Sequence, residues 1–435
     1  MLLTRFWNLF SGPMGIYCVA RFLSPVEQGY YYTFSSILGL NIFFELGLGF
    51  VIMQFASHEK AGLEWTEEGD LMGNERNLKR LGSLLRFAVR WYGIAATISL
   101  IGISLGGCWF FRTSHHDGAG VQWMIPWLFV CLASSISFFL APIYGILEGC
   151  GKIAEMNGLF AKQAILSSIV FWIALFGGLK LFAVPLLAMI PLVVAGPIIF
   201  SKYFKALLTL WRVSAGGEET ISWKQEILPL QWKISLSWAS GYFIFQLAAP
   251  VLFRTQGAVV AGQYGMSLKM IESIQSLSQA WMATKAATFG TLIAKKEFVN
   301  LKRLFRKTLF SSVGANILFS SGFLGLIVGL HLMKFPIAAR FLPTSLLTLM
   351  CLNAFLNCVI FSIACLLRAE KREPLFGLSI AAAILNTVAV MTLGIHFGPI
   401  GIIVPLLAVN FFLALPVLFY FWKDFWRRSV QIPQN

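Results

Sequence analysis

The chain has 435 residues, of which 57% are hydrophobic and only 12% are charged, and it contains 40 Phe and 14 Trp. A soluble globular domain carries about a quarter of charged residues, so this composition is that of a membrane protein. The net charge of +15 does not indicate nucleic-acid binding, because basic residues on the cytoplasmic side of a polytopic membrane protein produce such an excess by themselves.

Twelve apolar segments follow one another along the chain, and each is about long enough to cross the bilayer core as a helix. They lie at 3–23, 29–55, 87–111, 123–147, 157–179, 181–201, 234–254, 263–290, 308–331, 344–367, 375–395 and 399–422. We therefore predict an all-α polytopic membrane protein. Its outside loops are short, so we expect neither an extramembrane domain nor enzyme activity.

The distribution of basic residues predicts the orientation. With a cytoplasmic N-terminus, 26 of the 34 Lys and Arg lie on the cytoplasmic side and 6 on the outside. The remaining two, Lys269 and Lys285, fall inside the eighth segment. The positive-inside rule therefore predicts that both termini face the cytoplasm.

The five letters NLKRL occur twice, at Asn77–Leu81 and Asn300–Leu304, ahead of the third and the ninth apolar segment. EQGYYYTFSS and AGQYGMSLKM enter the second and the eighth segment in the same way and pair Gly29 with Gly262. This shared order indicates a duplicated chain. We predict two pseudo-symmetric six-helix lobes, 1–215 and 216–435, around a central cavity.

Cysteine and histidine patterns give no metal site. The seven Cys residues have no CxxC spacing. His115, His116 and Asp117 are adjacent in sequence, so their side chains point in different directions, and no fourth ligand is near. We predict neither a metal nor a cofactor; a coupling ion, proton or sodium, remains open.

Two stretches, RFLSPVEQGYYYTFSS and FFELGLGFVIMQFASHE, resemble the bacterial polysaccharide flippases of the multidrug/oligosaccharidyl-lipid/polysaccharide transporter superfamily. The matching positions are Arg21, Leu23, Ser24, Pro25, Gly29 and Tyr31, then Glu45, Leu46, Gly47, Leu48 and Gly49. LEGCGK at Leu147–Lys152 resembles the short cytoplasmic turn of that family.

This resemblance implies a fold like that of the multidrug (MATE) exporters, with two lobes whose cavity opens alternately to each side. It also implies movement of an undecaprenyl-diphosphate-linked oligosaccharide from the cytoplasmic to the outer leaflet of the bacterial inner membrane. Such lipid-linked units feed O-antigen (lipopolysaccharide), exopolysaccharide or capsule synthesis. The lipid bilayer and the polymerase and chain-length proteins of polysaccharide assembly would be the partners, and nucleic acid would not.

Charged and amide side chains at bilayer depth are the candidate site residues, because a charge at a helix centre costs about 2.5–3.5 kcal/mol on insertion scales. The candidates for the cavity and for substrate binding are Arg21, Glu45, Arg254, Lys269, Glu272, Lys285, Asn353 and Asn357. Lys269 and Glu272 are spaced i, i+3, so they can share a helix face. Their two open interpretations are a self-neutralising pair, and an ammonium for a diphosphate with a carboxylate that releases it or carries a proton.

The other candidates also keep two interpretations each. Lys285, about 24 Å beyond Lys269 at helical rise, could extend to cytoplasmic headgroups or line the cavity. Arg21 and Arg254 could hold a diphosphate at the outward mouth or contact outer-leaflet phosphates. Glu45, which precedes Gly-Leu-Gly, could mark a helix break or act as a proton-coupled switch or sugar contact.

Asn353 and Asn357 could hydrogen-bond sugar hydroxyls, but contacts between helices are the commoner use of such amides.

Two other functions compete with the flippase. Multidrug/cation antiporters of the same superfamily commonly use a carboxylate in their first helix, and residues 3–23 contain no Asp or Glu. Basic intramembrane residues also suit an anionic diphosphate better than a cationic drug. A membrane-bound glycosyltransferase or polymerase would need a large extramembrane loop with paired acids, which the sequence lacks.

Overall fold

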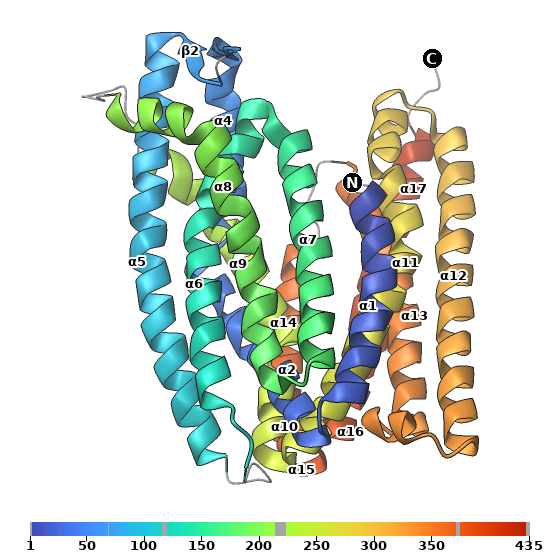
Figure 1. Ribbon diagram of the computed structural model, residues 1–435. Coiled ribbons are helices and arrows are strands. Elements are labelled where there is room, and N and C mark those ends of the chain that lie inside the picture. The colour runs from blue at the N-terminus through green and yellow to red at the C-terminus, as the bar shows by residue number, and fades with distance from the viewer. Residues whose placement is uncertain (1, 68, 115–119, 214–222, 371–374, 432–435) are drawn as a thin grey trace. The chain divides into compact units, whose positions relative to one another are not determined.

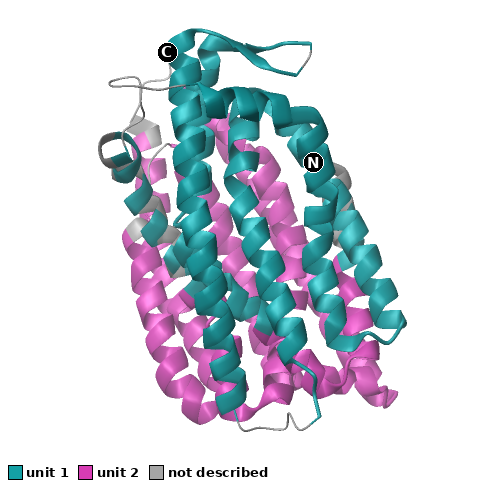
Figure 2. Ribbon diagram, turned by 60° about the vertical axis from the view of Figure 1, so that its left-hand side comes forward, with its two compact units in different colours: residues 1–11, 34–115, 119–242 teal, residues 12–33, 116–118, 243–435 magenta. Residues whose placement is uncertain are grey.

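The computed structural model describes every residue except 1, 68, 115–119, 214–222, 371–374 and 432–435 (Figure 1). The described residues form two compact units (Figure 2). Unit 1 lies within Met1–Ser11, Phe34–His115 and Ala119–Tyr242, and unit 2 within Gly12–Thr33 and Phe243–Asn435. The predicted lobe boundary, between 215 and 216, and the residues 115–117 lie outside the described residues.

Unit 1 contains the start of α1, the end of α2 and the elements that follow up to most of α9. Their bounds are α1 (Leu2–Phe22), α2 (Pro25–Leu38), the 3₁₀ turn η1 (Gly39–Asn41), α3 (Ile42–Glu45), α4 (Leu48–Glu59), the 3₁₀ turn η2 (Lys60–Gly62), β1 (Leu63–Trp65), β2 (Leu71–Gly73), α5 (Glu75–Thr113), α6 (Met124–Leu147), the π turn η3 (Glu148–Lys152), α7 (Ile153–Phe176), the 3₁₀ turn η4 (Lys180–Phe182), α8 (Ala183–Arg212), the π turn η6 (Trp223–Ile227) and α9 (Leu228–Phe245). Within this unit α5 packs against α6 and α8, and α7 packs against α8.

Unit 2 contains the rest of α1 and α2 and the C-terminal elements. Their bounds are α10 (Ala248–Gln256), α11 (Ala258–Ala294), α12 (Phe298–Leu332), the 3₁₀ turn η7 (Pro336–Arg340), α13 (Thr344–Arg368), α14 (Phe376–Ala389), the π turn η8 (Val390–Gly394), α15 (Ile395–Phe397), α16 (Pro399–Ala408), the π turn η9 (Val409–Ala414) and α17 (Leu415–Gln431). The helices α11, α12 and α13 pack against one another (Figure 1), and α17 packs against α13.

The predicted all-α polytopic fold is confirmed. Each of the twelve predicted segments consists almost entirely of helical residues. Among the described residues, seven helical stretches are long and apolar enough to cross a membrane, one of which joins α6, η3 and α7 into Met124–Phe176. An eighth is Pro25–Glu45 with Leu48–Gly62, if these two pieces, bent by 45°, count as one span.

A small β-hairpin departs from the all-helical prediction. β1 and β2 pair antiparallel, with Leu63 opposite Gly73 and Trp65 opposite Leu71. Leu63 and Leu71 are buried in the core of unit 1, and the Trp65 indole N–H donates to the carbonyl oxygen of Cys150 at 2.8 Å. Strands of three residues are too short to show a periodic pattern in the sequence, which is why this segment looked like a polar connection.

Both NLKRL copies begin a long helix at the same position. Asn77 is the third residue of α5, and Asn300 is the third residue of α12. Asn74 caps α5, because its side-chain oxygen accepts a hydrogen bond from the backbone N–H of Arg76 at 2.9 Å. The equal placement agrees with the duplication that the sequence predicts.

Candidate functional site

The ion pair expected on α11 is present. The Nζ atom of Lys269 lies 2.7 Å from Oε2 of Glu272, and the two side chains are 45% and 35% exposed. The pair is eleven residues into α11, about 17 Å from its first residue at helical rise. The ion pair therefore stands open inside a helix whose residues 263–290 the sequence predicts to cross the bilayer, where a charge would be costly.

The pair belongs to a face of α11 that is polar or small along its whole open length. At 100° per residue this face is centred on Lys269, and all of its members are at least partly exposed. They are Lys269, Glu272, Ser273, Ser276, Ala280, Ala283, Thr284, Ala287 and Thr291.

The exposed face of the neighbouring helix α12 has the opposite character. It carries large apolar side chains, among them Phe310, Ile317, Leu318 and Leu326. An apolar face suits lipid, whereas polar side chains in transmembrane helices face a protein interior or a water-filled space. The open face of α11 is therefore suited to water and to a polar ligand.

Buried tyrosines lie beside the acidic end of this face. The carboxylate of Glu272 interacts electrostatically with the phenols of Tyr32 and Tyr264, each of which is only 4% exposed. The ring of Tyr31 lies 4.9 Å from that of Tyr32. Tyr31 is a position of the flippase-like motif, but none of the three tyrosines was among the candidate site residues that the sequence predicts. The repeated Gly-x-Tyr that contains Tyr31 in one half and Tyr264 in the other was the signal that could have found them.

Residues of the flippase-like motif have structural contacts. The backbone N–H of Ser24 donates to Oε2 of Glu27 at 2.8 Å, and the backbone N–H of Glu27 donates to Oγ of Ser24 at 3.1 Å. This reciprocal capping box begins α2, and Pro25 occupies its first turn. Ser24 and Pro25 therefore set where α2 starts.

Gly29 is required by the close approach of α2 to α11. A Cβ atom on Gly29 would lie 2.0 Å from the carbonyl oxygen of Ala258, and one on Gly262 would lie 2.8 Å from the backbone nitrogen of Gly29. Gln28 donates from Nε2 to the carbonyl oxygen of Gly262 at 2.8 Å. The two glycines that the repeat equates thus meet each other in unit 2.

The remaining charged candidates of unit 2 do not join the pair. Arg21 and Arg254 are exposed in the last turns of α1 and α10, the equivalent places that the sequence predicts. Lys285 is exposed on α11, but sixteen residues of helix turn it about 160° away from Lys269. Lys285 therefore points away from the polar face.

Glu45 lies in unit 1, at a break in the helix. α3 ends at Glu45, and Leu46 and Gly47 have φ values of 51° and 68° before α4 begins. Ser235 donates from Oγ to the carbonyl oxygen of Leu46 at 2.8 Å, so the break is stabilised by α9. The carboxylate and the hydroxyl of buried Tyr92 approach the same point, 3.1 and 3.4 Å from where a Cβ on Gly49 would be. The helix break of the first interpretation is therefore present, and the carboxylate at this break lies beside a hydroxyl group.

A polar contact next to this break was missed by our sequence analysis. Asn41 donates from Nδ2 to Oγ of Ser134 at 2.9 Å and accepts a hydrogen bond from Oγ of Ser99. These bonds join η1 to α6 and α5 in the interior of unit 1. A single Asn among apolar residues gave no pattern that could have indicated them.

Asn353 and Asn357 of α13 are engaged by another amide. Asn410 in the π turn η9 donates from Nδ2 to Oδ1 of Asn353 at 2.7 Å and to Oδ1 of Asn357 at 3.2 Å. Contacts of this kind hold helices together in a membrane. Within the part of the chain that the structure describes, no group of three His, Cys, Asp or Glu side chains is placed to hold a metal ion.

Comparisons with known proteins support the fold. No family model matches the chain, and no curated protein matches its sequence. A multidrug resistance MATE family transporter of the MOP superfamily, in an inward-facing conformation, is 14% identical, with 99% of this chain and 96% of that chain covered and a TM-score of 0.72. The lipid II flippase MurJ, in an inward closed conformation, is 15% identical, with 100% and 94% covered and a TM-score of 0.54. The chain therefore has a fold that drug exporters and a lipid flippase share.

Proposed function

We propose that the chain is a transporter that moves an anionic, lipid-linked oligosaccharide from the cytoplasmic to the outer leaflet of the bacterial inner membrane. The substrate would be an undecaprenyl-diphosphate-linked unit for a surface polysaccharide such as O-antigen or exopolysaccharide. The observation that carries the proposal is the open polar face of α11, with the side chain of Lys269 exposed eleven residues into a helix that the sequence predicts to cross the bilayer.

Lys269 gives this face a preference for an anion. Its ammonium lies 2.7 Å from one carboxylate oxygen, and the side chain as a whole is 45% exposed, so a second oxygen ligand can approach it. An ammonium has three donors, and a phosphate oxygen is a stronger partner for it than water. The serine and threonine hydroxyls farther along the face can bind sugar hydroxyl groups.

Glu272 gives the pair a way to release the substrate. While a diphosphate is bound, it competes with this carboxylate for Lys269, and when the diphosphate leaves, the carboxylate takes the ammonium back. A carboxylate displaced in this way can also accept a proton, which would make a proton the coupling ion. If the displaced carboxylate takes up a proton, the site leaves no bare charge on Glu272 while the diphosphate is bound and none on Lys269 after it has left.

The second candidate is a multidrug antiporter, because a MATE transporter shares the fold over almost the whole of both chains. A cationic drug would bind Glu272 and be repelled by Lys269. The two candidates therefore differ in which charge of the pair is essential, and this difference can be measured.

Complementation in a strain that lacks the chain separates the two functions. A flippase deletion loses surface polysaccharide and retains lipid-linked units in the inner leaflet, and only the intact chain restores export. If the strain keeps its polysaccharide but becomes sensitive to cationic dyes, the antiporter is supported and the flippase is refuted.

Lys269→Ala tests the site. Loss of one hydrogen bond between charged groups costs about 1.5–3 kcal/mol, so we expect export to fall about 10- to 150-fold with an unchanged amount of protein in the membrane. Lys285→Ala is the matched control, since it removes the same charge from the same helix, and it should complement fully. Full complementation by Lys269→Ala would exclude Lys269 from the site.

The double exchange Lys269→Glu with Glu272→Lys separates binding from neutralisation. It keeps an ion pair at the same two positions. If the pair only neutralises itself, the exchanged chain should export as well as the intact chain. If Lys269 binds the substrate, the exchanged chain should export as poorly as Lys269→Ala, because the ammonium has moved by about one helical turn.

A further inference from the structure

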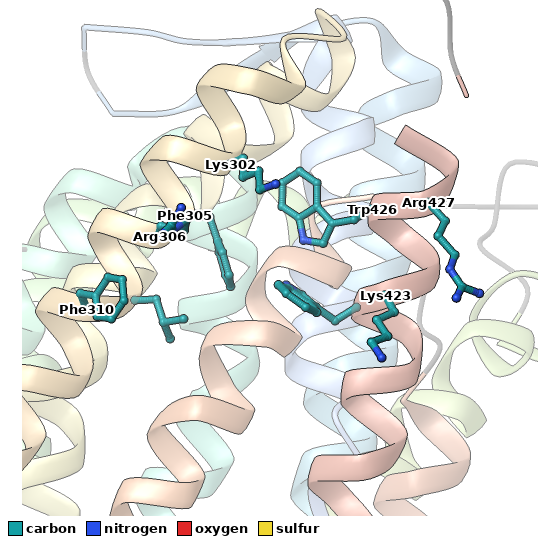
Figure 3. A pocket seen from close by; sticks show the side chains of 9 residues that line it. Lys302, Phe305, Arg306, Phe310, Lys423, Trp426 and Arg427 are labelled. Atoms are coloured by element: carbon teal, nitrogen blue, oxygen red, sulfur yellow. The ribbon is translucent and has the colours of Figure 1, made fainter. Parts of the chain in front are cut away.

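A groove of about 820 Å³ lies in unit 2 between the start of α12 and the end of α17 (Figure 3). Lys302 and Arg306 line it from α12, and Lys423 and Arg427 line it from α17. Each pair is spaced i, i+4, so each helix presents its two cations on one side. Four cationic side chains therefore line one groove, two from each helix.

These four charges have no anionic partner among the described residues. None of the four makes a salt bridge or a hydrogen bond there, and the Nζ atom of Lys423 lies 4.9 Å from the centre of the Phe419 ring. Two acids that contact α17 are engaged by a different cation, because Asp424 and Glu370 pair with Arg428 at 3.0 and 3.3 Å. Four like charges in one groove repel each other until an anion binds.

Aromatic side chains form the rest of the wall. Trp422 and Trp426 lie one turn apart on α17, and Phe305 lines the groove from α12 while also belonging to the core of unit 2. The indole N–H of Trp422 is buried and has no hydrogen-bond acceptor among the residues that the structure describes. Tryptophan is typical of the level at which a membrane meets water, where apolar chains and phosphates are both close.

The polarity of the groove changes along its length. On α12 the cations come first, and Leu309 and Phe310 follow towards the middle of the helix. Phe310 is 68% exposed and continues into the apolar face that carries Ile317 and Leu318. The charged end lies at the helix start, which the charge distribution predicts to be cytoplasmic, so the apolar end points into the membrane.

We infer that this groove binds an anionic phospholipid of the cytoplasmic leaflet, with its phosphate among the four cations and an acyl chain over Leu309 and Phe310. A phospholipid has this order of charge and apolar length, and basic pockets between helices on the cytoplasmic side recognise such headgroups. The bound lipid links α12 to α17. The inference does not depend on the proposed transport function.

Lipid titration of the purified full-length protein tests the inference. Binding of phosphatidylglycerol and of phosphatidylcholine in detergent is followed by native mass spectrometry. The intact chain should bind the anionic lipid at least about tenfold more tightly. Lys302→Gln with Arg306→Gln should weaken that binding about 25-fold, because each interfacial cation contributes about fivefold.

The chain offers a matched control one residue further along α12. Arg303 and Lys307 are also exposed and spaced i, i+4, but they do not line the groove. Arg303→Gln with Lys307→Gln should leave the affinity for phosphatidylglycerol within about twofold. Lys302→Arg with Arg306→Lys, which keeps both charges, should also retain binding and shows whether the glutamine variant lost charge or lost its fold.

Three results would overturn the inference. Both glutamine pairs could weaken binding equally, which would mean a diffuse charge effect. Phosphatidylcholine could bind as tightly as phosphatidylglycerol, which would mean that the phosphate charge is not recognised. Undecaprenyl phosphate could displace phosphatidylglycerol at a concentration below that at which phosphatidylglycerol itself binds, which would make the groove a substrate site instead.

Discussion

Replacing Gly29 with Ala should strongly destabilise unit 2, although it adds a single methyl group. The new Cβ would lie 2.0 Å from the carbonyl oxygen of Ala258, and ordinary contact begins at 3.4 Å, so α2 and α11 must separate by about 1.4 Å. Overpacking of this kind costs about 1–3 kcal/mol. The separation also breaks the 2.8 Å hydrogen bond from Gln28 to Gly262, which adds about 1 kcal/mol. We expect a total loss of about 3 kcal/mol.

Two further glycine variants provide reference values for the loss of stability. Gly262→Ala, whose Cβ would lie 2.8 Å from the nitrogen of Gly29, should destabilise less. Gly314→Ala adds its Cβ to open space on α12 and should be neutral or stabilising by up to about 1 kcal/mol, because Ala favours a helix over Gly. Thermal unfolding of the three full-length variants in one detergent, followed by size-exclusion chromatography, gives the order. Equal melting temperatures for Gly29→Ala and Gly314→Ala would refute the close-approach argument, whatever the melting temperature of Gly262→Ala.

Two other contacts lead to predictions that a melting curve can check. Asn410→Leu removes both hydrogen bonds to α13 and leaves the buried oxygen of Asn353 without its donor. The melting temperature should therefore fall by the equivalent of about 1 kcal/mol. An unchanged melting temperature would mean that these amides do not hold the helices together. Arg80→Gln should cost about 2 kcal/mol or more, because the side chain of Glu59, 2.7 Å away and only 11% exposed, loses its charged partner. Arg76→Gln is the control at an exposed position of the same helix, and an equal effect of both variants would contradict the role of Arg80.

Much of the fold could be predicted because each membrane helix shows in the sequence as a run of about twenty apolar residues. The ion pair of Lys269 and Glu272 could also be predicted, because residues spaced i, i+3 on one helix lie on the same face. Contacts between distant segments could not be found in this way. The bonds from Asn410 to α13 bridge more than fifty residues, and the meeting of Asn41 with Ser99 and Ser134 depends on how three helices pack.

The family-like motif illustrates a different limit of sequence analysis. Its residues Ser24, Pro25 and Gly29 were selected because they resemble a flippase pattern, and their contacts in this chain begin α2 and seat it against α11. Such a pattern follows the architecture, and architecture is what a drug exporter and a lipid flippase share. The substrate must therefore be inferred from exposed charge, such as that of Lys269, which the motif does not include.

The two NLKRL copies show how a duplicated segment acquires different roles without a change of its own letters. In the first copy Lys79 pairs with Glu75 at 2.9 Å, and Arg80 bridges Glu59 and Glu226, both at 2.7 Å. Glu59 is the last residue of α4 and Glu226 lies in η6, so both acids that pair with Arg80 lie outside the repeated motif.

In the second copy Lys302 occupies the position that Lys79 has in the first, and two cations of α17 line the same groove as Lys302. These cations have no acidic partner among the described residues, so their charge is available to an external anion such as the phosphate of a lipid. The role of each lysine therefore follows from the charges placed near it, an acid for Lys79 and two cations for Lys302. Exchanging Lys423 and Arg427 for Glu should convert the proposed lipid groove into an internal ion-pair network. Phosphatidylglycerol binding would then be lost while the melting temperature is kept or raised; loss of both would show that the groove also needs its cations for packing.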